Sequence, residues 1–220
     1  MDQHDLPAPG SSERTRVRRI PEKAVEDRAV LHAVLDAGLV AHVGIVDEDG
    51  QPFVVPVAYA RDGERLLFHG STGSRLFRRL ADGARTCVTV TLLDGLVLAR
   101  SAFESSMSYR GAMALGSCVV LEGEERDQAL RRISDHLLPG RWDDIRPPSR
   151  KELAATLVLA LPLDEVSVKV SAGGPDDDPA DLDRPVWAGR VPLREVFGDP
   201  VPDDAGAAYP VPAYLETWTR

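Results

Sequence analysis

A short loop between an apolar strand and a helix collects the residue types that hold a phosphate group. Backbone N–H groups, hydroxyls and a guanidinium converge there on the positive end of a helix, an arrangement that binds anions. The residues are His69, Gly70, Ser71, Gly73, Ser74 and Arg75. Hydroxyls before a helix also serve simply as N-caps, so Ser71 and Ser74 taken alone have an equally good structural explanation.

Three details favour a bound phosphate over capping alone. His69 closes the strand and faces the loop, and the two glycines let the backbone approach a ligand closely. Arg75 falls in the first helical turn, where the helix dipole disfavours a cation unless an anion is bound. The loop therefore predicts a site for a phosphorylated ligand.

Two neighbouring segments could complete such a site. Pro56 interrupts the strand-like run that includes Val55 and Val57, and this break either exposes backbone groups to a planar heterocycle or marks an edge strand. Farther along, Tyr109 and Arg110 follow a polar, serine-rich stretch. They could flank an aromatic ligand, or Arg110 could pair with Glu104 at the surface.

The elements that position these residues form a β-rich pattern. Strands are predicted at residues 39–46, 53–60, 66–69, 86–92, 96–103 and 109–121, with Asp94 and Gly95 opening a hairpin. Helices are predicted near residues 21–38, 74–81, 127–138 and 150–156, and a strand broken at Pro162 lies within 157–170. The fold class is mainly β with α, a six-stranded antiparallel split β-barrel with peripheral helices.

Composition narrows the function class. The formal charge of −9 argues against a nucleic-acid partner, and no apolar run is long enough to span a membrane. Cys87 and Cys118 show no metal-ligand or disulfide spacing, so no metal site is predicted. No secretory pattern opens the sequence, and we expect a cytoplasmic protein. Motifs for Rossmann, P-loop, zinc-protease and hydrolase sites are absent.

The chain divides into three parts. Residues 1–15 are polar and aperiodic and predict a disordered N-terminal arm, and residues 16–172 form the barrel domain. Residues 173–220 are rich in proline, glycine and aspartate. They predict an extended C-terminal arm that packs on the barrel or on a partner subunit.

The combination of these segments resembles the pyridoxamine 5′-phosphate oxidase-like flavoproteins. The residues that carry the resemblance lie at 51–59, 68–75 and 87–90. Residues 106–110 and 186–189 are similar to the branch that includes nitroimidazole-resistance proteins and flavin-nucleotide-binding proteins. The resemblance spans roughly residues 16–200, and its specificity lies in the combination rather than in one motif.

The resemblance implies a homodimer with FMN at the subunit interface. His69, Gly70, Ser71, Ser74 and Arg75 match the phosphate-binding segment. The residues matched to the flavin ring are Val55, Pro56, Val57, Tyr109, Arg110 and Trp187, the last of them reaching across from the second subunit.

Two departures set this chain apart from the true oxidases. Leu76 stands where they have a phosphate-binding lysine, and their C-terminal substrate-gripping segment is missing between residues 191 and 220. Vitamin B6 oxidation is therefore not the expected activity.

The leading hypothesis is an FMN-dependent oxidoreductase acting on a small molecule with a nicotinamide reductant or oxygen. In it the flavin supplies the redox chemistry, and His69 is a phosphate contact or a proton donor. The alternatives are a flavin carrier or sensor, a protein that binds deazaflavin F420 or haem on the same fold, and a structural dimer without a chromophore.

Overall fold

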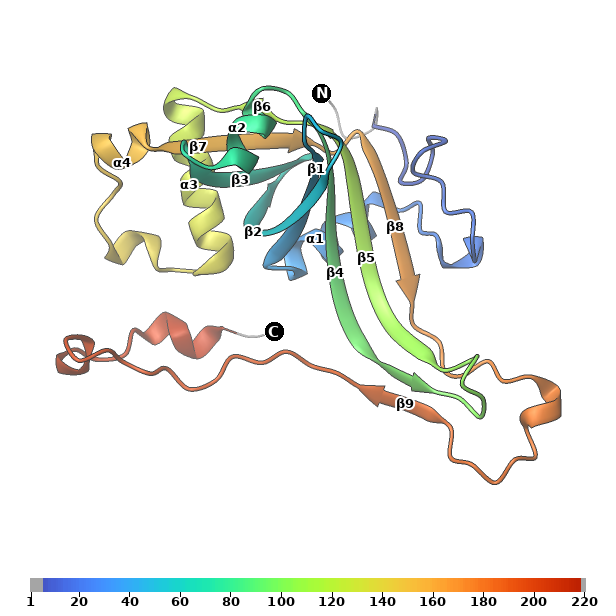
Figure 1. Cartoon of the computed structure of the whole chain (residues 1–220). Helices are drawn as coiled ribbons and strands as arrows, with labels where there is room; N and C mark the ends of the chain where they lie inside the picture. The colour runs from blue at the N-terminus through green and yellow to red at the C-terminus, as the bar shows by residue number, and fades with distance from the viewer. Residues whose placement is uncertain (1–5, 219–220) are drawn as a thin grey trace.

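A strongly curled antiparallel sheet forms the centre of the molecule, as seen in the computed structural model, which describes residues 6–218 (Figure 1). The strands run in the order β6-β7-β3-β2-β1-β4-β5-β8, and β9 pairs with β4. The strands are β1 (Val40–Val46), β2 (Pro52–Asp62), β3 (Arg65–Ser71), β4 (Arg85–Leu98), β5 (Ser106–Ser117), β6 (Val119–Val120), β7 (Thr156–Pro162), β8 (Glu165–Ser171) and β9 (Gly189–Pro192).

Helices pack on both faces of the sheet. The α-helices are α1 (Arg28–Ala37), α2 (Arg75–Ala81), α3 (Gly123–Leu137) and α4 (Arg150–Ala154). Short 3-10 helices are η1 (Pro21–Lys23), η2 (Trp142–Asp144), η3 (Pro179–Asp181), η4 (Gly206–Ala208) and η5 (Ala213–Thr217). No helix within residues 6–218 is long and apolar enough to cross a lipid bilayer.

The mainly-β architecture with peripheral helices is as predicted, but the count of six strands is wrong. The segment around Pro162 forms two strands, β7 near one end of the sheet and β8 at the other end. Two further short strands, β6 and β9, pair with β7 and β4. Asp94 and Gly95 do not turn a hairpin. They lie inside β4, which pairs with β5 from Arg85 to Val97 with a bulge between Leu93 and Gly95. Glycine is needed at this bulge because a Cβ on Gly95 would lie 2.7 Å from the Val191 carbonyl oxygen of β9.

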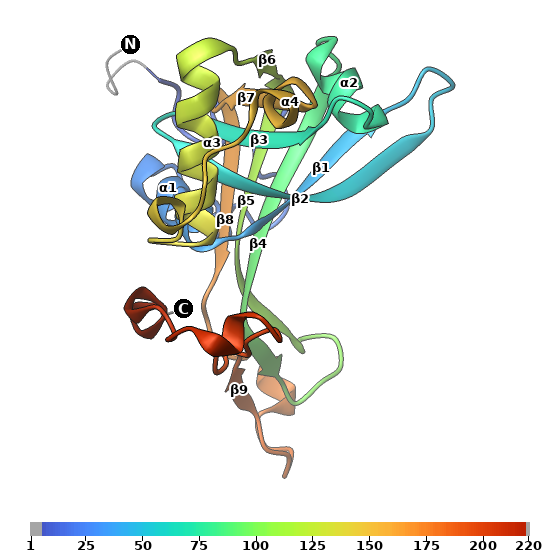
Figure 2. The same ribbon diagram turned by 90° about the vertical axis from the view of Figure 1, so that its left-hand side faces the viewer.

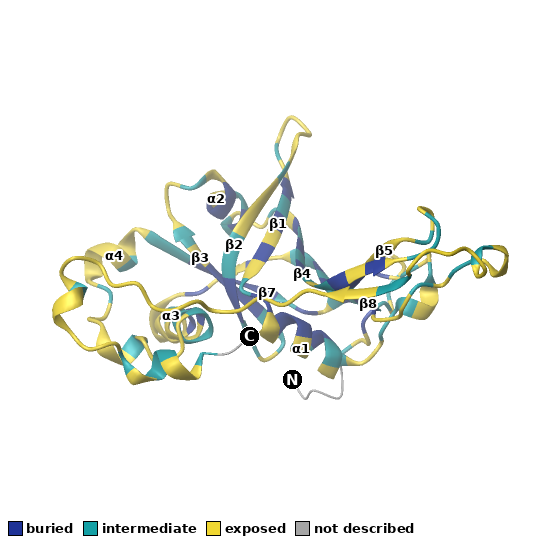
Figure 3. Cartoon of the chain, turned by 90° about the horizontal axis from the view of Figure 1, so that it is seen from below, coloured by how far each residue is buried: buried dark blue, intermediate teal, exposed yellow. Residues whose placement is uncertain are grey.

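Two apolar clusters hold the sheet together (Figure 3). The larger fills the interior of the curl, between the inner strand faces and helices α1 and α2. Helix α1 contributes Leu31, Val34 and Leu35, whose spacing places them on one helix face. The smaller cluster lies under α3 on the other face of β3 and β7. Strand β3 is therefore covered on both faces along its first half.

The curl opens where β2 separates from β3. The two strands pair only from Asp62 opposite Arg65 to Tyr59 opposite Phe68. Beyond that point β3 continues to pair with β7, while β2 pairs only with β1. Residues 53–58 of β2 therefore have one free edge, and α2 begins beside it.

Both terminal segments lie against the sheet. Residues 6–15, predicted as disordered, run beside β8, where the Gly10 amide donates to the Val166 carbonyl at 2.7 Å and Thr15 is buried. Residues 1–5, the rest of the predicted arm, lie outside the described part of the chain. The C-terminal arm pairs with β4 through β9 and then runs back toward α3 (Figure 2). There the Trp218 indole donates to the Pro139 carbonyl at 3.0 Å.

The position of α2 depends on a close contact between a ring and a glycine. A Cβ on Gly70 would lie 2.3 Å from the ring of Phe77, so the ring lies directly on the backbone of β3. We predict that Gly70→Ala lowers the free energy of unfolding by about 1–3 kcal/mol, the usual cost of overpacking. Urea denaturation measures this change.

Gly73→Ala is the matched control for this substitution. A Cβ on Gly73 would meet only the Ser71 hydroxyl, at 3.5 Å. The control is expected to stay close to the wild-type stability. Equal stabilities of the two variants would show that Phe77 does not need the space at Gly70.

Candidate functional site

A groove of about 470 Å³ lies along the free edge of β2 and reaches the start of α2. It brings together five of the residues predicted from the sequence, Val55, Pro56, Val57, Ser74 and Arg75. The other residues that line it are Ile45, Phe53, Ala58, Leu76 and Phe77. Its walls are mostly apolar, with a strand edge on one side and a guanidinium at the rim.

The polar groups of the groove come from the backbone of β2. Pro56 stands opposite His42 of β1, and because proline has no N–H, this pair is one of the non-hydrogen-bonded pairs of the ladder. Hydrogen-bonded and non-hydrogen-bonded pairs alternate, so the backbone groups of Val54, Pro56 and Ala58 face away from β1. The groove edge therefore offers two amide donors flanking the Pro56 carbonyl acceptor. Pro56 therefore lies on a free strand edge, which is one of the two interpretations of this proline given from the sequence.

The hydroxyls before α2 have local partners. The Ser74 hydroxyl caps the helix by accepting from the Phe77 amide at 3.5 Å, and the Ser71 hydroxyl accepts from the Gly73 amide at 3.1 Å. Leu76 is mostly buried and lines the groove with an apolar side chain, so it offers no charge to a phosphate. A helix cap at Ser74 and a local turn contact at Ser71 thus account for the two hydroxyls without a ligand.

Arg75 is the cation at the groove rim. Its guanidinium lies over the Phe53 ring at 3.9 Å and contacts the Asp47 carboxylate at 3.3 Å, with 56 % of the side chain exposed. A single long contact at an exposed position holds the guanidinium weakly. Arg75 can therefore turn its donors to an anion that enters the groove.

Sequence reasoning missed Phe53 and Asp47 as neighbours of Arg75. Phe53 stands opposite Ile45 in the β1–β2 ladder, so strand alternation could have placed it on the inner face beside the groove. No signal in the sequence indicates that Asp47, in the turn after β1, would approach α2.

His69 lies at the mouth of the opening, one residue beyond the last β2–β3 pair. It stands opposite Val158 of β7, and its side chain is on the face of β3 away from Gly70 and α2. The prediction that His69 faces the loop is therefore wrong, because alternation along β3 gives that face to Gly70. Its ring has no hydrogen-bond partner within residues 6–218, and the surrounding protein lowers the pKa of the imidazole through desolvation although the residue is exposed. His136, in contrast, contacts the Gly38 carbonyl at 2.7 Å.

The remaining predicted residues lie away from the groove in the same chain. Arg110 is not paired with Glu104 as the surface alternative proposed. It forms a two-pronged ion pair with Asp94, at 2.7 and 2.9 Å, which lowers the pKa of that carboxyl. Arg110 lines a separate cavity of about 510 Å³ beneath the C-terminal arm.

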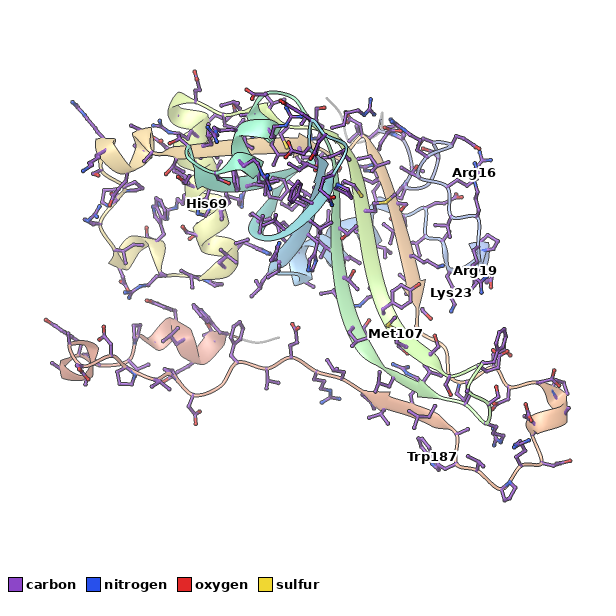
Figure 4. All side chains as sticks on the ribbon, viewed as in Figure 1. Arg16, Arg19, Lys23, His69, Met107 and Trp187 are labelled. Carbon is purple, nitrogen blue, oxygen red and sulfur yellow. The ribbon has the colours of Figure 1, made fainter. Side chains whose placement is uncertain are left out.

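The aromatic residues predicted to contact the flavin ring are also distant from the groove. Tyr109 is half-buried on β5, and Trp187 is exposed beside β9 with its ring over Gly189. Trp187 and His69 lie at opposite ends of the molecule (Figure 4). No cluster of three or more histidine, cysteine or acidic side chains placed to hold a metal occurs among the described residues.

The curled sheet, with a groove where one strand leaves its neighbour, defines a split β-barrel protein. Residues 27–170 match the family model described as pyridoxamine 5′-phosphate oxidase. That span is more than half of the chain, and the chain belongs to this family, which confirms the resemblance seen in the sequence. A search of curated proteins finds no match.

Solved structures with the same fold include proteins named for flavin and haem. The FAD and haem binding protein from Mycobacterium smegmatis is 42 % identical over 90 % of this chain and 97 % of its own, with a TM-score of 0.86. The flavocytochrome Anf3 from Azotobacter vinelandii is 40 % identical over 97 % of this chain and 99 % of its own, with a TM-score of 0.89. A candidate 5-nitroimidazole antibiotic resistance protein from Bacteroides thetaiotaomicron is 25 % identical over 67 % of this chain and 86 % of its own, with a TM-score of 0.55.

The surroundings of His69 predict a low titration midpoint. Desolvation disfavours the charged imidazolium, so we expect the His69 ring to titrate below its usual value of 6.5. As the pH falls through 6.5 the unfolded chain binds this proton before the folded chain does, and His69 therefore costs stability in that range. An NMR titration, with His69→Gln to assign the signal, measures the midpoint. A midpoint at or above 6.5 would contradict the desolvation argument.

Proposed function

We propose that the chain binds a flavin in the groove along β2 and acts as a redox protein on a small molecule. The observation that carries the proposal is the meeting of a free strand edge with an exposed, weakly held guanidinium in one mostly apolar groove. An isoalloxazine ring has an apolar, planar body and an edge of N–H and carbonyl groups. The amide donors and carbonyl acceptor on β2 complement that edge, and Arg75 complements the phosphate.

FMN is the smallest flavin that would use both features, and FAD shares the same ring and first phosphate. The similarity to proteins named for FAD binding and as a flavocytochrome supports a flavin over an unrelated anion. When bound, the flavin supplies hydride or electron transfer. The chain supplies binding and orientation. His69 lies where β2 and β3 separate, on the face of β3 away from α2, and can exchange a proton there.

A second copy of the chain would complete the site. The outer face of the β1–β2 hairpin leaves Val40, Val46 and Val54 about half exposed or more, an apolar surface beside the groove edge. We propose a homodimer in which this surface is covered and in which the partner's Tyr109 and the partner's Trp187 approach the flavin. This arrangement gives a role to residues that lie far from the groove of their own chain.

A flavin and haem protein is the second candidate function. The specific observation is His69, whose imidazole is exposed, favours the neutral form and has no hydrogen-bond partner among the described residues. A neutral imidazole with a free ring nitrogen is a suitable axial ligand for haem iron. The two structures with at least 40 % identity are named for haem binding and as a flavocytochrome. A bound haem would supply one-electron or oxygen chemistry.

The phosphate contact predicts a selective loss of affinity. Arg75→Ala should weaken FMN binding about ten- to a hundredfold, because a hydrogen bond to a charged group contributes about 1.5–3 kcal/mol. Riboflavin, which has no phosphate, should bind the variant and the wild type equally. Quenching of flavin fluorescence measures both affinities.

Arg79→Ala is the control, since Arg79 lies on the same helix and contacts Glu48 at 3.3 Å rather than the groove. It is expected to change neither affinity. If Arg75→Ala weakened riboflavin and FMN alike, Arg75 would not contact the phosphate.

The haem candidate predicts that His69 supplies the iron ligand. On titration with haemin, the wild type should develop the sharp Soret band of a ligated haem, and His69→Ala should lose it while retaining FMN affinity. His32→Ala is the control, because the His32 imidazole on α1 lies 2.9 Å from the Glu64 carboxylate and is not among the residues that line the groove. An unchanged Soret band in His69→Ala would exclude His69 as the ligand.

A further inference from the structure

The segment that precedes α1 is positively charged in an otherwise acidic protein. Between residues 13 and 23 the sequence has five cations and two carboxylates, whereas the whole chain has a net charge of −9. We call residues 13–23 the basic segment. Neither the groove nor the redox role proposed above uses it.

Two of these five cations have no carboxylate partner within the described residues. Arg14 pairs with Glu165, and Glu13 is shared by Arg18 and, at 3.5 Å, by Arg16. The side chains of Arg19 and Lys23 have no hydrogen bond or ion pair within residues 6–218.

The surplus cations are grouped in space. Figure 4 shows Arg16, Arg19 and Lys23 in a row on the side of β8 that faces away from the rest of the sheet. This row therefore presents two free cations and one that is held only by a shared carboxylate.

The basic segment is fixed in place rather than trailing from the sheet. The Lys169 ammonium of β8 donates to the Arg19 carbonyl at 3.2 Å, and the Val25 amide donates to the Val168 carbonyl at 3.1 Å. Ile20 has a φ of 56°, the one positive value at a non-glycine residue in the described part of the chain. A β-branched residue is strained in this conformation, which persists only where the surrounding contacts hold it.

The end of the basic segment lies in one row with a half-buried glycine that has an aromatic ring beside it. Ala24 pairs with Lys169, which in turn stands opposite Gly111 of β5, so the end of the basic segment and Gly111 lie in one row across the sheet. A Cβ on Gly111 would meet nothing closer than 3.8 Å, and the Tyr109 ring borders that space. A planar base could lie against this backbone with its edge toward the half-buried Tyr109.

Cations near an aromatic side chain are the chemistry that recognises the phosphates and the base of a nucleoside diphosphate. We propose that the basic segment and the surface at Gly111 bind the adenosine diphosphate half of FAD, with the phosphates on Arg16, Arg19 and Lys23. The inference rests on the proposed flavin function and identifies the bound flavin as FAD rather than FMN. Because β1, β4 and β5 separate β2 from β8 in the sheet, this half of the site serves a flavin held in the groove of the second copy.

The test compares FAD, FMN and ADP on the full-length protein by calorimetric titration at one fixed ionic strength. A triple variant, Arg16→Gln with Arg19→Gln and Lys23→Gln, should bind FAD at least about tenfold more weakly than the wild type, while FMN affinity changes by less than about twofold. ADP should bind the wild type and not the variant.

A control triple removes the same charge elsewhere. It carries Arg126→Gln, Arg131→Gln and Arg132→Gln on α3, where each arginine faces a carboxylate. It should bind all three ligands as the wild type does. Circular dichroism checks that both triple variants fold.

The outcomes separate this inference from the flavin proposal. If FAD affinity in the basic-segment variant equals that of the wild type, or falls no more than FMN affinity does, the inference is overturned while the flavin proposal stands. If neither flavin binds the wild type, the flavin proposal fails, and the ADP titration then tests the surface alone. ADP binding that the triple variant abolishes supports the surface as a nucleotide site. If ADP does not bind the wild type, the inference is overturned.

Discussion

The separation of β2 from β3 is the constraint on which the rest of the site depends. Backbone pairing between these strands stops at Tyr59 and Phe68, and the free edge of β2 that follows is what a planar ligand can bind. Pro56 favours this separation because it removes a donor that a third strand would need. On the other side of the gap, Phe77 rests on Gly70 and holds the start of α2 beside the free edge.

Electrostatics then distinguishes two arginines that looked alike in the sequence. Arg110 is held by two hydrogen bonds to Asp94, whereas Arg75 has one long contact with Asp47 and a ring beneath it. A guanidinium already saturated by a carboxylate gains little from a new anion, while a weakly held one gains a charged hydrogen bond. For the same reason Arg19 and Lys23, which have no partner among the described residues, gain more from a new anion than the paired arginines do.

Local features of the fold were predictable from the sequence, and features that depend on distant partners were not. The N-cap at Ser74, the helix that follows it and the proline-marked edge of β2 result from interactions within a few residues. The prediction of a hairpin at Asp94 and Gly95 is wrong, because β4 continues past them in its pairing with β5 and the glycine serves the close approach of β9, about 100 residues later. Likewise, nothing near Arg110 indicates that Asp94 rather than Glu104 is its partner, since the register of β4 against β5 sets that pairing.

The central claim is that the free edge of β2 binds a flavin ring, and amide hydrogen exchange on addition of FMN tests it most directly. The Val54 and Ala58 amides face the groove and should exchange much more slowly when FMN is bound, because each gains an acceptor. The Val55 and Val57 amides, already bonded to β1, should change little. Exchange at Val54 and Ala58 that is unaffected by saturating FMN would contradict the account.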